Sequence, residues 1–224
     1  MTGAPGAWPG AWFGDTDKKS MHKAGRSRSG SAAAAYWQFM REFLRHPRQI
    51  GALCPSSPVL ARRIASLVPQ GKGLVVELGP GGGAVTAALL RHGVAAKDLV
   101  LVERSEALAR QLSRRFPAVR LIHGDAAQLA SFELLRCHRV RAIVSSLPLR
   151  SLPAQQVRQI LDQVSAIASP RTVFIQFSYA LHASYIGMAQ GFEREYTQLV
   201  WRNLPPARVE SFRYTLEVPQ AAAA

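Results

Sequence analysis

The chain has 224 residues, 48% of them hydrophobic, which excludes a largely disordered protein and indicates one globular domain with an appendage. Twenty-eight basic residues against 14 acidic ones give a formal net charge of +14, which favours an anionic partner such as nucleic acid or an acidic membrane surface. The sequence shows no apolar run long enough to cross a bilayer, no signal-peptide pattern and no cysteine spacing typical of a metal site. We therefore expect no metal site. We expect a cytoplasmic protein that is peripheral on the inner face of the cell membrane, and its oligomeric state stays open.

The N-terminal quarter of the chain divides into two segments. Residues 1–34 are rich in Gly, Ala, Ser and Pro, become basic and lack hydrophobic periodicity, which predicts a disordered basic tail. In 35–56, apolar side chains recur at helical spacing beside a stripe of arginines. Two interpretations stay open: a helix that packs on the domain, or an amphipathic helix that binds anionic lipid. Under the second, the membrane-binding residues are Trp37, Met40, Arg41, Phe43, Leu44, Arg45 and Arg48.

Residues 57–218 alternate between strand-like and helical patterns, with a short tail at 219–224. Ser57 is suited to be an N-cap and Pro58 to be the first helical residue. This alternation predicts an α/β, Rossmann-like domain with a mostly parallel seven-stranded sheet, helices on both faces and a closing hairpin. The predicted strands are 74–78, 99–102, 119–122, 142–145, 172–177, 196–202 and 209–216, and the predicted helices are 58–68, 84–92, 105–115, 127–135 and 154–167.

A glycine-rich turn follows the first predicted strand. Glu77 lies at the strand end, and Gly79, Gly81 and Gly83 follow with G-x-G-x-G spacing, not the G-x-G-x-x-G of dinucleotide sites. Glycine lets a backbone approach a ligand closely, and the helix N-terminus behind it attracts anionic groups. The pattern resembles motif I of the S-adenosylmethionine-dependent methyltransferases, in which the strand-end acid lies near the methionine part of the cofactor. Pro80 completes this part of the predicted cofactor site.

Further candidates lie at the carboxyl ends of the next strands, where open α/β sheets bind their ligands. Glu103 follows the turn by about 20 residues, the separation of an acid that accepts hydrogen bonds from ribose hydroxyls, and the alternative is a solvated surface acid. Asp125 suits an adenine amino group or a helix N-cap, and these roles are compatible. Arg104, Ala126 and Ser145 complete the predicted cofactor-binding set.

The segment after the fourth predicted strand reads Ser145-Ser146-Leu147-Pro148-Leu149. The nucleic-acid amino-methyltransferases carry D/N/S-P-P-Y/F here, and the ribosomal RNA adenine dimethylases carry N-L-P-Y. Because Leu149 replaces the aromatic ring, a flipped base would lose its main stacking contact. We therefore expect an acceptor amine that is not on a base and consider nucleic acid an unlikely partner. The predicted substrate-binding residues of this segment are Ser146, Leu147 and Pro148.

From residue 36 to residue 214 the chain resembles the soluble, bacterial type of phospholipid N-methyltransferase. The resemblance implies methylation of phosphatidylethanolamine towards phosphatidylcholine by S-adenosylmethionine at the membrane surface, and an N-terminal helix that binds anionic lipid. The chain departs from the family's common pattern at Gly82, where Thr is usual, and after Tyr179, where Ala180 and Leu181 replace Gly-Pro. The matching stretches are 47–52 with 55–57, 77–81, 119–126, 145–153, 176–179 and 202–207.

An alkylamine is mostly protonated near pH 7 but must be neutral to accept a methyl group, so some residue must hold it or relay its proton. The candidates are Tyr179, Tyr36 and His182. A headgroup phosphate also needs cations, and Arg150, Arg194 and His182 are the nearby supply. For all of these except Tyr179, packing or a solvated surface position is an equally open interpretation.

Three alternatives to this function remain. The acceptor is another aminolipid, such as one built on ornithine, or it is an adenine N6 of ribosomal RNA or DNA. The third alternative is a lipid-surface binding protein with a degenerate methyltransferase fold. Intact Glu77, Gly79, Gly81, Glu103 and Asp125 argue against the third alternative, because they are the residues expected to bind the cofactor.

Overall fold

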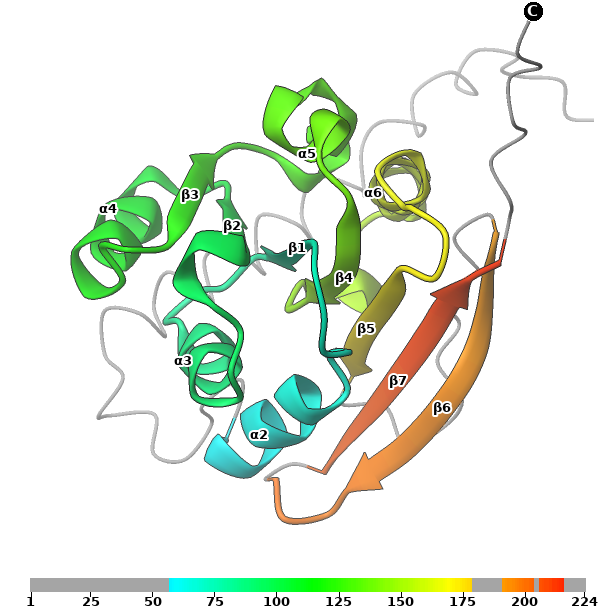
Figure 1. Ribbon diagram of the computed structural model, residues 1–224. Helices are drawn as coiled ribbons and strands as arrows, with labels where there is room; N and C mark the ends of the chain where they lie inside the picture. The colour runs from blue at the N-terminus through cyan, green and yellow to red at the C-terminus, as the bar shows by residue number, and fades with distance from the viewer. Residues whose placement is uncertain (1–56, 179–190, 204–205, 216–224) are drawn as a thin grey trace, which may run out of the picture.

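The computed structural model describes residues 57–178, 191–203 and 206–215, which form one seven-stranded sheet with helices on both faces (Figure 1). The predicted fold class is confirmed. The strands are β1 (Leu74–Leu78), β2 (Leu99–Glu103), β3 (Arg120–His123), β4 (Val140–Ser145), β5 (Val173–Ser178), β6 (Phe192–Val200) and β7 (Ala207–Tyr214). The helices are α2 (Pro58–Ser66), α3 (Ala84–Arg91), α4 (Glu106–Arg115), α5 (Glu133–Cys137) and α6 (Ala154–Ala166), with 3-10 turns η1 (Ala96–Asp98), η2 (Ala126–Ser131) and η3 (Leu149–Ser151).

The strand order is β3-β2-β1-β4-β5-β7-β6. The first five strands are parallel, and β7 runs antiparallel to both β5 and β6. The carboxyl ends of β1 to β5 therefore share one edge of the sheet, called the carboxyl edge below. The turn between β6 and β7 lies at the same edge, because Ser178 at the end of β5 pairs with Arg208 at the start of β7.

Two hydrophobic cores lie on opposite faces of the sheet. Side chains from α2 and α3 pack on Val75 and its neighbours on one face, and those from α5, α6 and η3 pack on Val76 and its neighbours on the other. All five residues of β1 are buried, as expected for a central parallel strand that helices cover on both sides. Packing on both faces holds the end of each strand in place, and with it the residues that follow that strand.

The predicted helix at 127–135 is two shorter pieces, η2 and α5. Phe132 separates them with an extended backbone, φ −83° and ψ 110°. Its ring packs against Gly124, where a Cβ would lie 2.4 Å from the Phe132 Cζ. Tertiary packing of this ring thus accompanies a break that local helical periodicity did not reveal.

The start of α2 is tied to the β6–β7 turn. The Ser57 side chain accepts a hydrogen bond from the Leu60 N–H at 3.2 Å, and Pro58 is the first helical residue, which confirms the predicted cap. The Ser57 N–H donates to the Asn203 side-chain oxygen at 3.1 Å, across 146 positions of sequence. Residue 57, where the N-terminal quarter joins the described chain, therefore lies near the carboxyl edge.

Candidate active site

The glycine turn leaves β1 at the carboxyl edge in a left-handed conformation. Gly79, Gly81 and Gly83 have φ values of 63°, 53° and 76°. A Cβ on Gly79 would lie 2.5 Å from the Leu147 side chain, and one on Gly83 would lie 2.5 Å from the Phe116 ring, so both glycines are required by the protein's own packing. A Cβ on Gly81 or Gly82 would meet nothing within 4 Å. Gly81 therefore borders open space in which a ligand can approach the backbone.

Glu77 is a carboxyl group enclosed by protein just before this turn. It is 0% exposed, and its Oε2 accepts a hydrogen bond from the Thr86 hydroxyl of α3 at 2.6 Å. Its Oε1 has no hydrogen-bond partner among the described residues. Burial raises the pKa of Glu77 to about 8, although the bonds from Thr86 act in the opposite direction. An unpaired buried acceptor of this kind is suited to a donor group on a ligand, such as an ammonium.

Glu103 ends β2 beside the turn. Its side chain is buried, so the alternative of a solvated surface acid is wrong. Its Oε1 accepts a hydrogen bond from the Ser105 N–H at 2.8 Å. Burial raises the pKa of Glu103, while the backbone N–H groups of Ser105, Gly81 and Arg104 favour the carboxylate. The carboxylate thus joins the end of β2 to the glycine turn.

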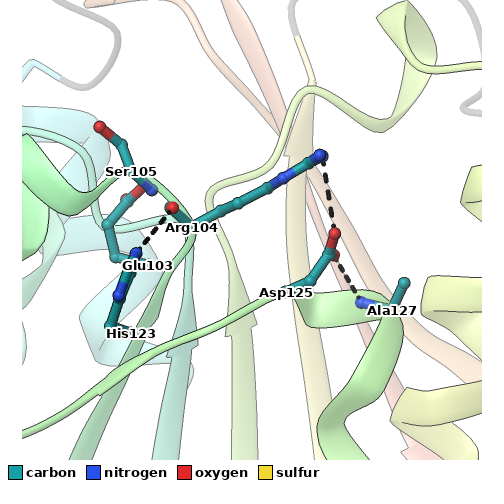
Figure 2. A network of polar contacts seen from close by, with 6 residues as sticks. All are labelled: Glu103, Arg104, Ser105, His123, Asp125 and Ala127. Carbon is teal, nitrogen blue, oxygen red and sulfur yellow. Dashed lines mark hydrogen bonds and ion pairs between the residues drawn. The ribbon is translucent and has the colours of Figure 1, made fainter.

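A second group of polar contacts connects the ends of β2 and β3 (Figure 2). The Ala127 N–H donates to Asp125 Oδ1 at 2.9 Å, so Asp125 caps η2, one of its two predicted roles. Arg104 Nη1 lies 3.5 Å from the other Asp125 oxygen, and the Arg104 carbonyl oxygen lies 3.2 Å from His123 Nε2. Ala126, the first residue of η2, is buried in one of the two hydrophobic cores. The predicted adenine contact of Asp125 is compatible with the cap, because Oδ2, which pairs with Arg104, can accept a further hydrogen bond.

The segment after β4 lies against the glycine turn. The Ser146 N–H donates to the Leu78 carbonyl at 2.9 Å, which holds the segment beside β1. The Ser145 and Ser146 hydroxyls are buried and have no partner among the described residues. Leu149 is 4% exposed and packs in the core with α6. The position at which the nucleic-acid enzymes carry a stacking ring is therefore a core position here.

The other predicted substrate residues lie further from these groups. Pro148 is half-buried, and Arg150 is exposed on η3. Arg194 lies on β6 opposite Phe212, closer to the amino end of β5 than to the carboxyl edge, and its Nη1 is 3.4 Å from Glu210 Oε1. Their roles remain predictions. Outside the described residues lie Tyr36, Tyr179, His182, the segment 1–34 and all seven predicted membrane-binding residues.

Sequence reasoning assigned no role to four residues that the structure places at or near the carboxyl edge. Thr86 binds Glu77, Asn203 binds Ser57, and Gln176 donates to the Leu147 carbonyl at 3.0 Å. Glu210 is 2% exposed on β7. Gln176 interrupts the apolar run of β5, and that interruption was the available sequence signal. Glu210 lies among other polar residues of β7, so its sequence neighbourhood gave no such signal.

Known proteins that resemble this chain are methyltransferases. Residues 75–171 match the family described as "Methyltransferase domain". The ornithine lipid N-methyltransferase of Singulisphaera acidiphila is 29% identical over 178 residues, which are 77% of this chain and 92% of that protein. The ribosomal RNA small subunit methyltransferase A of Afipia carboxidovorans is 42% identical over 78 residues, but these are only 33% of this chain and 27% of that protein.

Solved structures share the fold at low sequence identity. The 1,6-didemethyltoxoflavin-N1-methyltransferase of Burkholderia thailandensis, bound to S-adenosylhomocysteine, superposes with a TM-score of 0.61 at 16% identity and covers 87% of this chain and 93% of its own. The N-methyltransferase NodS of Bradyrhizobium japonicum WM9, also bound to S-adenosylhomocysteine, gives 0.60 at 16% identity, covering 80% and 97%.

The residues at the carboxyl edge fit S-adenosylmethionine. Gly81 leaves open space beside its backbone, and Glu77 Oε1 offers a buried acceptor to the ammonium of the methionine part. Glu103 offers a buried carboxylate to the ribose hydroxyls. These features fit the match of residues 75–171 to the methyltransferase domain family. That match and the relatives show that the chain is a methyltransferase, and the solved structures share its class I, S-adenosylmethionine-dependent methyltransferase fold.

Proposed function

We propose that this enzyme methylates the primary amine of a membrane aminolipid, phosphatidylethanolamine or ornithine lipid, at the membrane surface. The observation that carries the proposal is the similarity to an ornithine lipid N-methyltransferase along 92% of that protein's length. The phospholipid N-methyltransferase pattern in residues 36–214 agrees with it. Both acceptors present a primary amine a few bonds from an anionic group.

Methylation of an adenine in RNA is the second candidate, because of the similarity to ribosomal RNA methyltransferases. That similarity spans at most 43% of this chain and 40% of the relative. The buried Leu149 also argues against it, because a base held at the end of β4 would receive no aromatic stacking from this position.

The reaction needs positioning more than covalent chemistry from the protein. When bound, S-adenosylmethionine would supply a methyl group on a sulfonium, and a neutral amine would accept that methyl group while the sulfur leaves as the thioether of S-adenosylhomocysteine. The chain has to hold the cofactor through Glu77, Gly81 and Glu103 and to present a neutral amine near the end of β4. Tyr179, Tyr36 and His182 remain the candidates for taking or relaying the amine proton.

The carboxyl edge has features that suit a membrane interface. Trp201 is 70% exposed in the β6–β7 turn, beside the exposed Arg202. Tryptophan and arginine are suited to the headgroup region, where one part of the side chain meets apolar and another polar surroundings. Ser57 is bonded to Asn203 in the same turn, so the predicted amphipathic segment joins the domain at this edge. None of the helices in the described part of the chain is long and apolar enough to span a bilayer.

Methyl transfer to defined vesicles tests the proposal. Full-length protein and methyl-labelled S-adenosylmethionine are mixed with vesicles of phosphatidylglycerol plus either phosphatidylethanolamine or ornithine lipid, and in parallel with ribosomal RNA. We expect label in at least one aminolipid and none in RNA. Label in RNA alone, or in no lipid while the cofactor binds, would refute the proposal.

The membrane half of the proposal has its own test. The triple variant Arg41→Glu, Arg45→Glu, Arg48→Glu is expected to lose binding to the anionic vesicles and most of the methyl transfer, because each basic residue contributes about 1 kcal/mol at such a surface. The control variant Arg136→Glu, Arg139→Glu, Arg158→Glu makes the same charge change on exposed residues of the described domain. Equal losses in both variants would show that net charge, not this segment, controls binding.

A further inference from the structure

A row of polar side chains crosses three adjacent strands at the carboxyl edge. Ser145 on β4 pairs in register with Gln176 on β5, and Gln176 pairs with Glu210 on β7. Residues paired in this way project from the same face of a sheet. Strands β4, β5 and β7 lie side by side in this half of the sheet (Figure 1). The three side chains are called the acceptor row below.

The acceptor row is buried but incompletely hydrogen-bonded. Ser145, Gln176 and Glu210 are 1%, 2% and 2% exposed. The Gln176 amide nitrogen donates to the carbonyls of Leu147 at 3.0 Å and Phe177 at 2.8 Å, which fixes the amide orientation. Gln176 Oε1 and Ser145 Oγ are left without a partner among the described residues. Buried polar atoms normally have partners, so unpaired oxygens here indicate a ligand that donates several hydrogen bonds.

Two arginines, Arg208 and Arg194, lie at the β7 end of the acceptor row, which is the end farther from the glycine turn. Arg208 lies two residues before Glu210, so it projects from the same face two residue pairs closer to the carboxyl edge, opposite Ser178. Its Nη1 donates to Thr197 at 3.1 Å, and a guanidinium has five N–H donors, enough to contact an anion as well. Arg194 pairs with Glu210. Burial raises the pKa of Glu210, and the two arginines oppose that rise.

We propose that the acceptor row and Arg208 form the headgroup subsite of the enzyme, which binds a zwitterion in one orientation. The ammonium donates to Ser145, Gln176 and Glu210, and the phosphate or carboxylate contacts Arg208 nearer the edge. This order matches a lipid that enters from the carboxyl edge, because its anionic group lies closer to the acyl chains than its amine does. The inference rests on the proposed function, since it takes an aminolipid as the acceptor.

Ligand binding to the full-length protein saturated with S-adenosylhomocysteine tests the subsite without turnover. The probes are O-phosphoethanolamine and ethanolamine, followed by ligand-observed NMR titration. We expect wild type to bind O-phosphoethanolamine at least tenfold more tightly than ethanolamine. Glu210→Gln should weaken both at least tenfold, the effect of losing one charge-assisted hydrogen bond. Arg208→Gln should remove the preference for O-phosphoethanolamine and leave ethanolamine binding unchanged.

Matched controls lie on β7 and on the neighbouring strand β6. Glu195 on β6 and Arg213 on β7 form an ion pair, and Arg213 is opposite Val173 at the other end of β5. Glu195→Gln and Arg213→Gln should leave both affinities within twofold of wild type. Unchanged S-adenosylhomocysteine affinity confirms folding of each variant. If Glu210→Gln fails that check, Glu210→Asp, which retains the charge but shortens its reach, should weaken both probes several-fold.

Several outcomes overturn the inference: no binding of either probe to wild type, wild-type affinities in Glu210→Gln, or equal losses of both probes in Arg208→Gln. Methyl transfer to phosphatidylethanolamine and ornithine lipid vesicles then distinguishes the two sources of the zwitterion. The expected binding pattern without transfer to either lipid would refute the proposed function alone. Transfer to lipid that Glu210→Gln leaves unchanged would refute the subsite alone.

Discussion

The two halves of the carboxyl edge satisfy their polar groups in different ways. In the cofactor half, each acid has a partner close in sequence: Glu103 with Ser105, Asp125 with Ala127, and Glu77 with Thr86, at separations of two, two and nine residues. In the acceptor half, Gln176 reaches across 29 residues to Leu147, and Glu210 across 16 to Arg194. Local contacts can be recognised as motifs, whereas the acceptor half exists only after the sheet assembles.

In the protein without a ligand, we expect the larger loss of unfolding free energy to come from the cofactor half, through the buried carboxyl group of Glu77. Below pH 4.5 Glu77 is protonated in both the folded and the unfolded chain. Between pH 4.5 and about 8 the unfolded chain ionises while the folded one stays neutral, so stability falls as pH rises. Above pH 8 the loss reaches its full value, of the order of 4 to 5 kcal/mol.

Urea unfolding of wild type and Glu77→Gln across pH 4 to 9 measures this effect. The variant should lose less stability with rising pH than wild type. Because a bound ammonium favours the Glu77 carboxylate, S-adenosylhomocysteine should stabilise wild type more than the variant at pH 8. Parallel pH profiles for the two proteins would contradict the raised pKa.

The glycine turn allows packing to be separated from ligand access. Gly83→Ala combines a φ of 76° with a Cβ 2.5 Å from the Phe116 ring, and we expect a loss of about 3 kcal/mol of unfolding free energy. Gly81→Ala carries only the backbone strain, about 1 to 2 kcal/mol, but weakens cofactor binding because its methyl group enters the open space. Urea unfolding and calorimetric titration with S-adenosylhomocysteine measure the two quantities.

Gly82→Ala is the matched control for both variants, because Gly82 has an ordinary φ and a Cβ added there would meet nothing within 4 Å. It should leave stability and cofactor affinity nearly unchanged. The same geometry explains why this position can hold either Gly or the Thr that is common in the resembling family, since a Cβ there would meet no other atom within 4 Å. A large loss in Gly82→Ala would mean that the open space is smaller than the structure shows.

The smallest effect is expected at the connection between the ends of β2 and β3. Arg104 is 55% exposed, so its ion pair with Asp125 contributes less than about 1 kcal/mol to stability. Arg104→Gln should therefore shift unfolding slightly, and less at 0.5 M salt than at low salt. A shift that does not depend on salt would indicate a packing role instead.

Much of the cofactor half was predictable from sequence. The strand–turn–helix pattern around Gly79 and the acids at the ends of β2 and β3 follow from local composition, and the structure places them at one edge. The burial of Glu103 was not predictable, because it depends on the glycine turn and the end of β3 lying beside the end of β2. The break at Phe132 was missed for the same reason, since its ring responds to Gly124 and not to helical periodicity.

The amino-acid pattern by itself determined the fold class, the cofactor turn and the N-cap at Ser57, because hydrophobic period, glycine spacing and capping act between residues close in the chain. Only the tertiary structure decided that β7 inserts between β5 and β6, and that insertion brings Glu210 beside Gln176. Pairing between distant strands is selected by the burial of whole faces, which no local pattern records. The acceptor row is the consequence, and its unpaired oxygens became visible only when the strands were in register.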